Sequence, residues 1–409
     1  MVQPVQVVVV GGGAAGFFGA IACAEAHPQA AVTLLEARQP LSKVRISGGG
    51  RCNVTHACFD PALLVQHYPR GGKALRGAFS RFQPRDTVNW FARRGVRLKT
   101  EADGRMFPTS DSSETIVDCL LQAARQAGVR LYTGSPVQAI RSWSGGFEVQ
   151  LKSDETLMAQ RLLLATGSSS QGYRLAQTLG HDLEPPVPSL FTFNIVDSAL
   201  RELAGVAVDR AQVRLILPNQ KPLEQTGPVL ITHWGLSGPA LLKLSAWGAR
   251  LLHDQQYQAQ IQINWLPHQN PDLSRQQLLQ VKQQQPQKTL ASFSPFDLPR
   301  RLWQYLVNRC GIPSERRWAE LSKQELLNLV AALHQSQHRV SGKGVFKDEF
   351  VTCGGVRLAQ VDFKTMQSRI CPHLYLAGEL LDIDGVTGGF NFQSAWTTGW
   401  LAGQAMGQL

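Results

Sequence analysis

Long hydrophobic runs are missing from this 409-residue sequence, and its cysteines and histidines are scattered. A membrane-spanning helix needs about 20 consecutive apolar residues, so we expect no membrane segment. The apolar residues 7–10 follow no positive charge and run into three glycines, which argues against an export signal. The seven cysteines form no CxxC pair and the ten histidines occur singly, so we expect no metal site and no hydrolytic triad. Scattered thiols without an export signal are typical of the reducing cytoplasm, where we expect this protein.

Positive charge, in contrast, is abundant and uneven. The net charge is +11, and residues 66–105 contain ten Lys or Arg against three acids, while residues 300–347 contain nine against three. Such segregation is typical of a surface that contacts a polyanion such as a nucleic acid. Two solvated helical faces of a basic protein are the alternative.

A glycine motif follows the first apolar run. Residues 7–10 predict a buried parallel strand, and Gly11-x-Gly13-x-x-Gly16 leads from it into an Ala-rich helix. Gly11 permits the tight turn, Gly13 lets a pyrophosphate approach the backbone, and Gly16 lets the helix pack on the strand. A second apolar run ends in Glu36, where an acid is expected to bind an adenosine ribose. The stretch predicts a dinucleotide site for either FAD or NAD(P).

Two later stretches favour FAD. Residues 161–164 predict a strand that ends in an Ala-Thr-Gly turn beside the cofactor. Near the C-terminus, a strand over residues 374–377 leads to Gly378 and Glu379, and a long helix begins near residues 388–391. The positive end of that helix can face the flavin pyrimidine and stabilise the anionic reduced ring. A nicotinamide enzyme needs no such return of the chain, so FAD is the expected cofactor.

The stretch RISGGGRCNVTH, residues 45–56, places three glycines before an arginine and a cysteine. Residues 48–50 lack side chains, which lets backbone N–H groups approach a pyrophosphate or the flavin edge. Arg51 offers a permanent positive charge, and Asn53 can donate or accept a hydrogen bond. Cys52 is a candidate general acid, because reducing a polarised C=C bond needs a proton as well as a hydride. A thiol that only packs is the alternative.

His233 lies in ITHWGLSGP, a glycine-containing turn, and is a second candidate for proton transfer. A lone histidine more often has only a structural role, and that alternative stays open.

Both ends of the chain resemble the YhiN/BaiN-like flavoproteins, also called the aminoacetone oxidase family of NAD(P)/FAD-dependent oxidoreductases. The matching stretches are VVVVGGGAAG, SGGGRCNVTH, ITHWGLSGPALL, FVTCGGV and TMQSRICPHLYLAGELLDIDGVTGGFNFQSAWTTGWLAG. The resemblance implies bound FAD and carbonyl-conjugated or amine small molecules as substrates or, for some members, uridine in ribosomal RNA. The sequence departs from the family pattern at Leu41, Arg45 and residues 227–229, where a glycine, an apolar residue and an acidic residue are expected.

The family resemblance and the order of the motifs predict an α/β fold. We expect a Rossmann-type FAD-binding domain from residues 1–187 and 341–409, built from both chain ends. Prolines 185, 186 and 188 mark its first exit, and short alternating runs follow. Residues 188–268 are expected to form a β-barrel-like insert and residues 269–340 a small helical insert.

The predicted FAD contacts come from the motifs and from the resemblance together. They are Gly11, Gly13, Ala14, Ala15, Gly16, Glu36, Ala37, Lys43, Ser47, Gly48, Gly49, Gly50, Arg51, Cys52, Asn53, Val137, Ala165, Thr166, Gly167, Gly378, Glu379, Asp384, Gly388, Gly389, Phe390 and Asn391.

Several functions are consistent with this site. The leading hypothesis is hydride transfer from flavin N5 to a polarised C=C bond, in a small conjugated molecule or in a uridine of ribosomal RNA. No second GxGxxG occurs, so NAD(P)H as a transient electron donor has to reach the flavin directly. The RNA hypothesis gains from the basic segments, because phosphate contacts supply most RNA affinity. Nearby aromatics are candidates for base stacking, and filling of the protein cores is the alternative: Phe79, Phe82, Trp90, Phe91, Trp303, Tyr305 and Trp318. Amine oxidation by dioxygen, and an RNA-binding or structural flavoprotein without turnover, are the alternatives.

Overall fold

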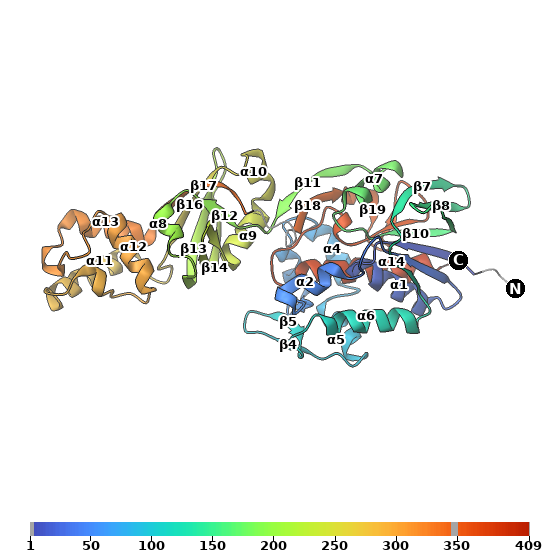
Figure 1. Cartoon of the computed structure of the whole chain (residues 1–409), viewed down its shortest axis with the longest axis horizontal. Helices are drawn as coiled ribbons and strands as arrows, with labels where there is room; N and C mark the ends of the chain where they lie inside the picture. Colours follow the sequence, from blue (N-terminus) through green and yellow to red (C-terminus); the bar gives the residue numbers. More distant parts are fainter. Residues whose placement is uncertain (1–3, 345–350, 409) are drawn as a thin grey trace. The chain divides into compact units, whose positions relative to one another are not determined.

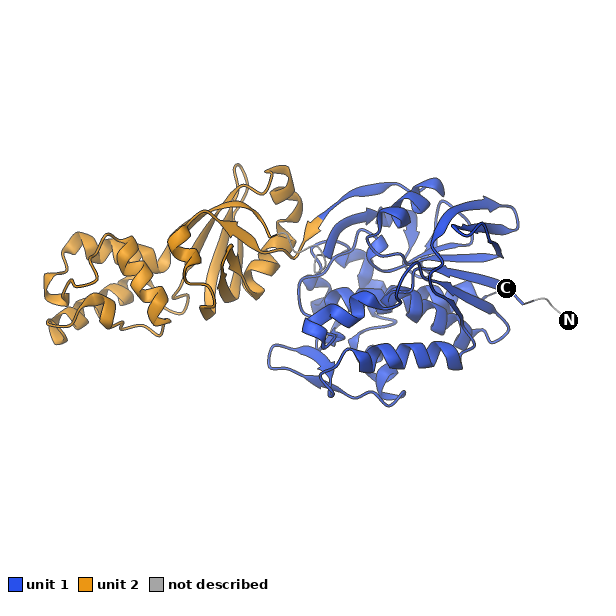
Figure 2. Ribbon diagram, viewed as in Figure 1, with its two compact units in different colours: residues 1–187, 351–409 blue, residues 188–350 orange. Residues whose placement is uncertain are grey.

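The computed structural model of the chain describes residues 4–344 and 351–408. The chain divides into two compact units, one of residues 1–187 with 351–409 and one of residues 188–350 (Figure 2). The predicted boundary at 187 falls at the first division, and the predicted boundary at 340 falls within strand β17 (Ser336–Lys343). Residues 345–350, which include the end of the second basic segment, lie outside the described residues.

A seven-stranded sheet forms the centre of the first unit, in the order β19-β20-β21-β10-β1-β2-β6. The five strands from β21 to β6 are parallel, and β19 and β20 are antiparallel. Val9 pairs with Leu163 on one side and with Leu34 on the other, and all three are buried because helices cover parallel sheets. The strands are β1 (Gln6–Val10), β2 (Ala31–Leu35), β6 (Arg130–Tyr132), β10 (Arg161–Leu164), β19 (Val361–Asp362), β20 (Gln367–Ser368) and β21 (Leu374–Leu376).

The first and last long helices pack against each other in this unit (Figure 1). They are α1 (Ala14–Ala26) and α14 (Phe390–Met406). An added Cβ at Gly399 of α14 would lie 2.4 Å from the carbonyl oxygen of Ala15 in α1. The two backbones therefore touch, and only glycine permits this approach. The predicted Rossmann-type domain, built from both chain ends, is confirmed.

Smaller elements surround this sheet. The antiparallel sheets are β7-β8-β9 and β3-β5-β4, and β11 pairs with β18. These strands are β3 (Thr55–His56), β4 (Leu98–Thr100), β5 (Arg105–Pro108), β7 (Val137–Trp143), β8 (Gly146–Leu151), β9 (Thr156–Ala159), β11 (Leu183–Ser189) and β18 (Val351–Val356). The helices are α2 (Ser42–Gly50), α3 (Pro61–Leu64), α4 (Gly72–Phe79), α5 (Pro84–Ala92), α6 (Glu114–Gln126) and α7 (Ser170–Thr178), with short 3-10 turns η1 (Val65–His67), η4 (Leu358–Gln360) and η5 (Gly378–Leu380).

A closed six-stranded barrel forms part of the second unit, which confirms the predicted β-barrel-like insert. Its strands alternate buried and exposed residues, as antiparallel strands do when one face packs on a core. In barrel order they are β12 (Phe193–Ile195), β15 (Gly235–Ser237), β14 (Leu223–Thr232), β13 (Ala207–Ile216), β16 (Ala259–Asn264) and β17.

Helices complete the second unit, and they share one hydrophobic cluster with the barrel. Trp303 and Leu329 of the helices and Ile263 of the barrel belong to this cluster and are buried. The predicted helical part is present, but it forms one compact unit with the barrel. The helices are α8 (Ser198–Arg201), α9 (Pro239–Trp247), α10 (Ala249–Asp254), α11 (Pro271–Gln284), α12 (Arg300–Arg309) and α13 (Lys323–His334), with η2 (Leu290–Ser292) and η3 (Trp318–Glu320).

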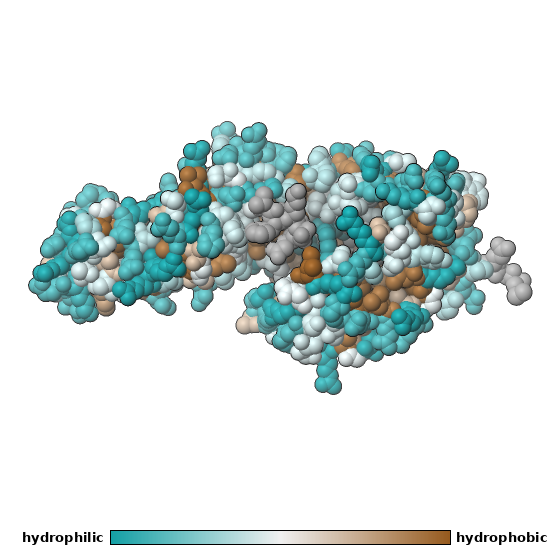
Figure 3. Space-filling view, viewed as in Figure 1, coloured by the Kyte–Doolittle hydropathy of each residue, from teal (hydrophilic) through white to brown (hydrophobic). Residues whose placement is uncertain are grey.

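Among the described residues, no helix is both long and apolar enough to span a membrane. Large apolar side chains that are exposed, such as Ile46, Trp143 and Leu273, are distributed over both units. The face seen in Figure 3 is mostly hydrophilic, with hydrophobic residues in small groups.

Candidate flavin-binding site

Of the three motif glycines in the first turn, Gly11 and Gly16 are crowded and Gly13 is open. At Gly11, which has a φ of +109°, an added Cβ would lie 2.4 Å from the carbonyl oxygen of Ala165. At Gly16, an added Cβ would lie 1.8 Å from the carbonyl oxygen of Gly11. At Gly13 no atom lies within 4 Å of such a Cβ. Gly13 is the N-cap of α1, so the open position adjoins the unpaired N–H groups of a 13-residue helix. This geometry fits a pyrophosphate at Gly13.

Glu36 lies at the carboxyl end of β2, beside the same turn. Its carboxylate accepts hydrogen bonds from the Gly12 N–H at 2.7 Å and from the Arg38 N–H at 2.8 Å. The two bonds orient a half-buried carboxylate whose remaining lone pairs can accept from a ribose. Glu36 therefore has the position and the chemistry of the predicted ribose contact, and Ala37 follows it on an exposed loop.

The triple glycine ends α2 in a left-handed turn. The helix breaks at Ser47, and Gly48, Gly49 and Gly50 have φ values of 58°, 68° and 82°. An added Cβ at Gly49 or Gly50 would have no atom within 4 Å. Successive N–H groups in such a turn form a concave donor surface, which fits an anionic or carbonyl-bearing ligand. The short helix before the glycines was not predicted from the sequence.

Arg51 already has partners within the first unit. Its guanidinium lies 2.7 Å from a carboxylate oxygen of Glu101 and 3.6 Å from one of Asp111. The guanidinium carbon also lies 4.0 Å from the ring centre of Phe107. These contacts neutralise the charge that we predicted would face a phosphate or the flavin, so that role of Arg51 stays a prediction.

Asn53 joins the triple-glycine segment to the start of α14. With its amide oriented to satisfy both neighbours, Asn53 accepts from the Gly389 N–H at 3.0 Å and donates to the Thr55 carbonyl at 3.1 Å. Gly389 is the N-cap of α14 and has a φ of +91°, and Phe390 begins the helix. The structure thus brings together two predicted cofactor segments that are far apart in the sequence. Asn391, the second residue of the helix, exchanges hydrogen bonds with the Gly385 backbone.

Lys43 and Glu379 connect further predicted segments. The Lys43 Nζ lies 2.7 Å from a Glu379 carboxylate oxygen and donates to the Ser168 hydroxyl at 3.3 Å. An added Cβ at Gly167 would lie 3.9 Å from the same Glu379 carboxylate. The neighbouring Thr166 Oγ1 is buried and has no hydrogen-bond partner among the described residues. An unpaired hydroxyl at the carboxyl end of β10 fits a ligand that supplies the missing bond.

Two other predicted contacts interact mainly with the protein. Asp384 is fully buried and its carboxylate pairs with the Arg70 guanidinium through two hydrogen bonds. Val137 begins β7, and its carbonyl accepts from the Gln171 side chain at 3.2 Å. Their predicted contacts with FAD stay predictions.

The two predicted proton donors lie in different units. Cys52 belongs to the first unit, is fully buried and has a φ of +59°, and burial raises the pKa of its thiol to about 12. A sealed, protonated thiol resembles the packing alternative more than a general acid near neutral pH. His233 is exposed in the second unit, between β14 and β15.

A histidine pair beside α14 was missed as a functional feature. The His67 and His56 rings stack on Phe390, with ring centres 4.3 Å and 4.7 Å from that of Phe390. Both histidines are half-buried, and the His56 Nε2 lies 3.1 Å from the Asp103 carbonyl. His56 is the last residue of SGGGRCNVTH, so this motif could have indicated His56 as a candidate site residue.

The departures from the family pattern have local consequences. Leu41 is buried and has a φ of +58° as the N-cap of α2, in the left-handed region that favours glycine. The expected glycine is thus replaced by a residue that is strained there. Arg45 in α2 forms an ion pair with Glu114 of α6, so a polar contact stands where an apolar residue was expected.

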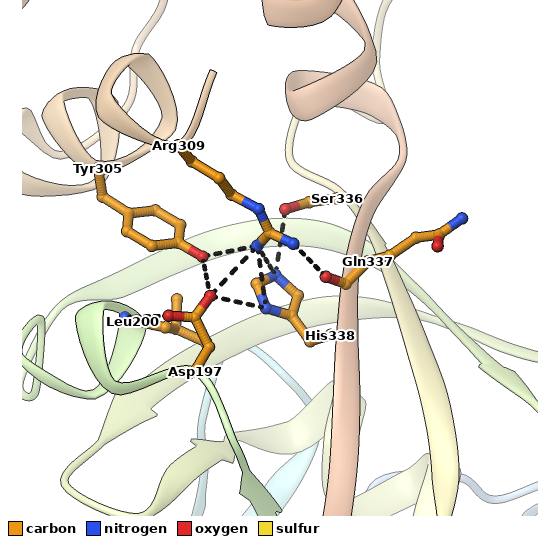
Figure 4. Close-up of polar contacts among 7 residues, drawn as sticks. All are labelled: Asp197, Leu200, Tyr305, Arg309, Ser336, Gln337 and His338. Carbon is orange, nitrogen blue, oxygen red and sulfur yellow. Dashed lines mark hydrogen bonds and ion pairs between the residues drawn. The ribbon is translucent and has the colours of Figure 1, made fainter. Parts of the chain in front are cut away.

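The second unit contains a polar cluster that was not predicted (Figure 4). The Tyr305 hydroxyl donates to Asp197 at 2.6 Å, and Arg309 donates to the Tyr305 oxygen at 2.6 Å and to the His338 Nδ1 at 3.2 Å. Burial, followed by the nearby Arg309 charge, lowers the pKa of His338 to about 3. The cluster fastens α12 to β17 and to the residue before α8.

The basic segments are only partly available to a partner. Arg94 pairs with Glu25, Lys99 with Asp111, and Arg316 lies within 4.0 Å of Glu320. A second group is exposed and forms no ion pair with any described acid: Lys73, Arg76, Arg81, Arg85, Arg93, Arg97, Arg300, Arg301, Arg317, Lys323 and Arg339.

The candidate base-stacking aromatics fill the cores. All seven are buried, so none presents a ring face to a nucleobase, and the core-filling alternative is confirmed instead of base stacking. They are Phe79, Phe82, Trp90, Phe91, Trp303, Tyr305 and Trp318.

Comparison with known proteins supports the flavin assignment. The chain is 31% identical over 406 residues to a 3-dehydro-bile acid delta(4,6)-reductase of Clostridium scindens, covering 97% of this chain and 98% of that one. It is 29% identical over 410 residues to a ribosomal RNA dihydrouridine synthase of Escherichia coli, covering 97% and 96%.

Solved structures share the fold at low sequence identity. The 3-ketosteroid-delta4-(5alpha)-dehydrogenase of Rhodococcus jostii RHA1 aligns with a TM-score of 0.54 and 16% identity, covering 100% of this chain and 98% of that one. A flavocytochrome c3 fumarate reductase aligns with a TM-score of 0.51 and 16% identity, covering 99% and 78%. A family model described as HI0933-like protein Rossmann domain matches residues 5–405. The chain therefore belongs to the HI0933-like Rossmann family, as the YhiN/BaiN-like resemblance predicted, and is an FAD-dependent oxidoreductase.

Proposed function

We propose that this flavoenzyme reduces a C=C bond that is conjugated to a carbonyl group. The observation that carries the proposal is the contact between Asn53 and Gly389, which holds the triple-glycine segment against the first turn of α14. The positive end of a 17-residue helix favours negative charge on a reduced flavin. Bound FAD would supply the hydride, and the protein's residues would hold the reacting groups and supply a proton.

The relatives support this reaction class through the chemistry in their names. One is named a delta(4,6)-reductase and another a dihydrouridine synthase. Dihydrouridine is uridine with its C5=C6 bond saturated, and that bond is conjugated to a ring carbonyl. Both names therefore describe saturation of a C=C bond, although the two acceptors differ greatly in size.

Among acceptors, we favour uridine in ribosomal RNA. Residues 66–105 leave six exposed cations without an ion pair to any described acid, and phosphate contacts supply most of the affinity for RNA. A uridine has to leave its stack to reach a flavin. A small conjugated ketone is the second candidate, since the bile acid reductase is 31% identical to this chain.

We infer that NADH or NADPH is the electron donor. Because the sequence contains no second GxGxxG, the nicotinamide would have to reach bound FAD directly. Cys52 and His233 remain candidates for the proton donor. A Cys52→Ala variant that retains FAD and turns over at the parent rate ends the role of Cys52 as an acid.

The proposal is tested by turnover with both acceptor classes. Purified enzyme is incubated with NADH or NADPH and either unmodified ribosomal RNA or a panel of enones, and the products are analysed by mass spectrometry. We expect a gain of two hydrogen atoms in a uridine of the RNA. A gain only in the enones supports C=C reduction with a small acceptor. If neither acceptor gains hydrogen, the proposed function is wrong.

A further inference from the structure

Tyr173 has a buried hydroxyl without a hydrogen-bond partner among the described residues. The residue is 6% exposed, and its Oη is one of the unpaired buried polar atoms. Buried tyrosine hydroxyls usually find a partner, because an unpaired polar group in the interior is destabilising. A hydroxyl left unpaired in a folded protein is therefore a reason to look for a missing ligand.

The surroundings of Tyr173 belong to the predicted cofactor site. Tyr173 lies in the first turns of α7, directly after the Thr166–Gly167 turn, and α7 packs against β18. An added Cβ at Gly172 would lie 1.8 Å from Thr166 Oγ1, which is itself buried and unpaired. Two unpaired hydroxyls thus follow the same strand, β10. Tyr173 also interacts electrostatically with Glu379, a predicted cofactor contact.

The phenol stays protonated in this environment. Burial raises the pKa of Tyr173 above its ordinary value, and the negative charges of Glu379 and Asp382 raise it further. A protonated phenol can donate its hydrogen to an oxygen or nitrogen acceptor. The carboxylate of Glu379 already accepts from Lys43 and from the Thr352 N–H at 2.9 Å, so it is engaged elsewhere.

The sheet order indicates which half of a dinucleotide Tyr173 can meet. Strand β1 lies between β10 and β2, and the glycine turn after β1 is the predicted pyrophosphate site. Glu36, the predicted ribose contact, follows β2 on one side of that turn, whereas Tyr173 follows β10 on the other side. An extended cofactor with its adenosine at Glu36 therefore carries its flavin half toward the β10 side.

We propose that the Tyr173 hydroxyl donates a hydrogen bond to the flavin–ribityl half of bound FAD. The inference deepens the cofactor assignment and rests on FAD binding, but it does not depend on which acceptor the enzyme reduces. Tyr173 is thus a cofactor-contacting residue that the sequence motifs did not identify. The unpaired hydroxyl destabilises the protein without its cofactor, and a hydrogen bond to bound FAD would remove that destabilisation.

The test is a Tyr173→Phe variant, which removes only the hydroxyl. The dissociation constant of FAD is measured from the fluorescence of released flavin on dilution of the holoenzyme, and ADP is used as a competitor. One neutral hydrogen bond corresponds to about 5- to 10-fold in affinity, so FAD should bind weaker by that factor. ADP should compete as it does in the parent, because it lacks the flavin–ribityl half.

Two tyrosines provide controls in the same unit. Tyr375 is buried in β21, and Tyr375→Phe should leave the FAD affinity unchanged. The Tyr68 hydroxyl donates to the Phe390 carbonyl at 2.6 Å, so Tyr68→Phe should lower the melting temperature of the protein. At saturating FAD, Tyr173→Phe should lower the melting temperature less than Tyr68→Phe does.

Three results would overturn the inference. FAD affinity within twofold of the parent would mean that the hydroxyl makes no bond to the cofactor. Equal weakening of FAD and ADP would place the effect in the adenosine half or in the fold. A loss of thermal stability equal to that of Tyr68→Phe would show that the hydroxyl has a structural partner. None of these results depends on turnover, so they are separate from a failure of the proposed reaction.

Discussion

Arg70 and Asp384 form a two-pronged ion pair inside the first unit, although 314 residues separate them in the sequence. The Asp384 side chain is fully buried and that of Arg70 is 16% exposed. The two residues also form an isolated β-bridge through their backbones. The pair therefore fastens the loop before α14 to the segment before α4, and so fixes where the last helix begins.

Removing one partner of this pair should be costly. An Arg70→Met variant leaves the buried Asp384 carboxylate without its cation, and such losses reduce the free energy of unfolding by about 3–5 kcal/mol. Urea denaturation followed by tryptophan fluorescence measures the effect. The control is Arg97→Met, which removes an exposed cation outside any described ion pair. If Arg70→Met costs no more than the control, the pair does not stabilise the unit.

Alanine at two glycines of the first turn should have opposite consequences. At Gly13 an added Cβ meets no protein atom, so Gly13→Ala should fold normally and lower FAD affinity by about 10-fold or more by blocking the pyrophosphate. At Gly16 the Cβ would lie 1.8 Å from a backbone oxygen, so Gly16→Ala should destabilise the unit itself. Flavin content and melting temperature separate the two effects. Normal FAD binding by folded Gly13→Ala protein would exclude Gly13 as the pyrophosphate contact.

The buried His338 should make the second unit less stable in acid. Its pKa is lowered to about 3 by burial, whereas an unfolded histidine has a pKa of about 6.5. Below pH 6.5 the unfolded chain binds a proton that the folded unit does not, so stability falls by up to about 1.4 kcal/mol per pH unit. The full contribution is present above pH 6.5 and declines as the pH falls toward 3.

Hydrogen exchange of the β17 amides between pH 7 and pH 4 measures this decline in the full chain, after correction for intrinsic exchange rates. The variant His338→Gln should flatten the pH dependence, even if it lowers the stability at pH 7. The exposed His233→Gln is the control in the same unit and should keep the parent slope. An unchanged slope in His338→Gln would mean that another group controls acid stability.

Charge reversal on the first unit tests the RNA contact. Arg93 and Arg97 are exposed and unpaired among the described residues, whereas Arg94 is held by Glu25. If both contact phosphates, Arg93→Glu with Arg97→Glu should weaken RNA binding and lower the salt slope by about 2. Filter binding at several salt concentrations measures both quantities.

The matched control reverses two exposed arginines outside residues 66–105, Arg130→Glu with Arg141→Glu. It changes the net charge by the same amount. If both double variants weaken RNA binding equally, the contact is a general effect of net charge, and residues 93–97 are not part of the interface.

Local signals in the sequence predicted the fold of the first proposed cofactor segment. The run from β1 through Gly11, Gly13 and Gly16 to Glu36 is a continuous strand–turn–helix–strand unit, and its geometry depends on residues close in sequence. The barrel strands were also predictable, because their alternation of buried and exposed residues is visible over a few positions.

Contacts between distant segments were not predictable in this way. Asn53 meets Gly389, and Arg70 meets Asp384, through the tertiary fold, and local patterns in a single sequence do not reveal such pairings. The same limit explains the Asp197–Tyr305–Arg309–His338 cluster, whose members come from three separate elements. Arg51 shows the same limit from the other side. The motif predicted that its guanidinium would bind a ligand, but it did not reveal that Glu101 already pairs with that guanidinium.

Anaerobic reoxidation of the reduced enzyme tests the central claim most directly. The bound flavin is reduced with light and a sacrificial donor, and its visible absorption is followed after adding unmodified ribosomal RNA, then enones, then air. We predict rapid reoxidation by the RNA before air enters, with dihydrouridine formed in proportion to the flavin oxidised. Reoxidation by enones alone would support C=C reduction but would make a small enone, and not uridine, the acceptor. A reduced flavin that is reoxidised by neither RNA nor enones and reacts only with air would contradict C=C reduction and favour amine oxidation by dioxygen.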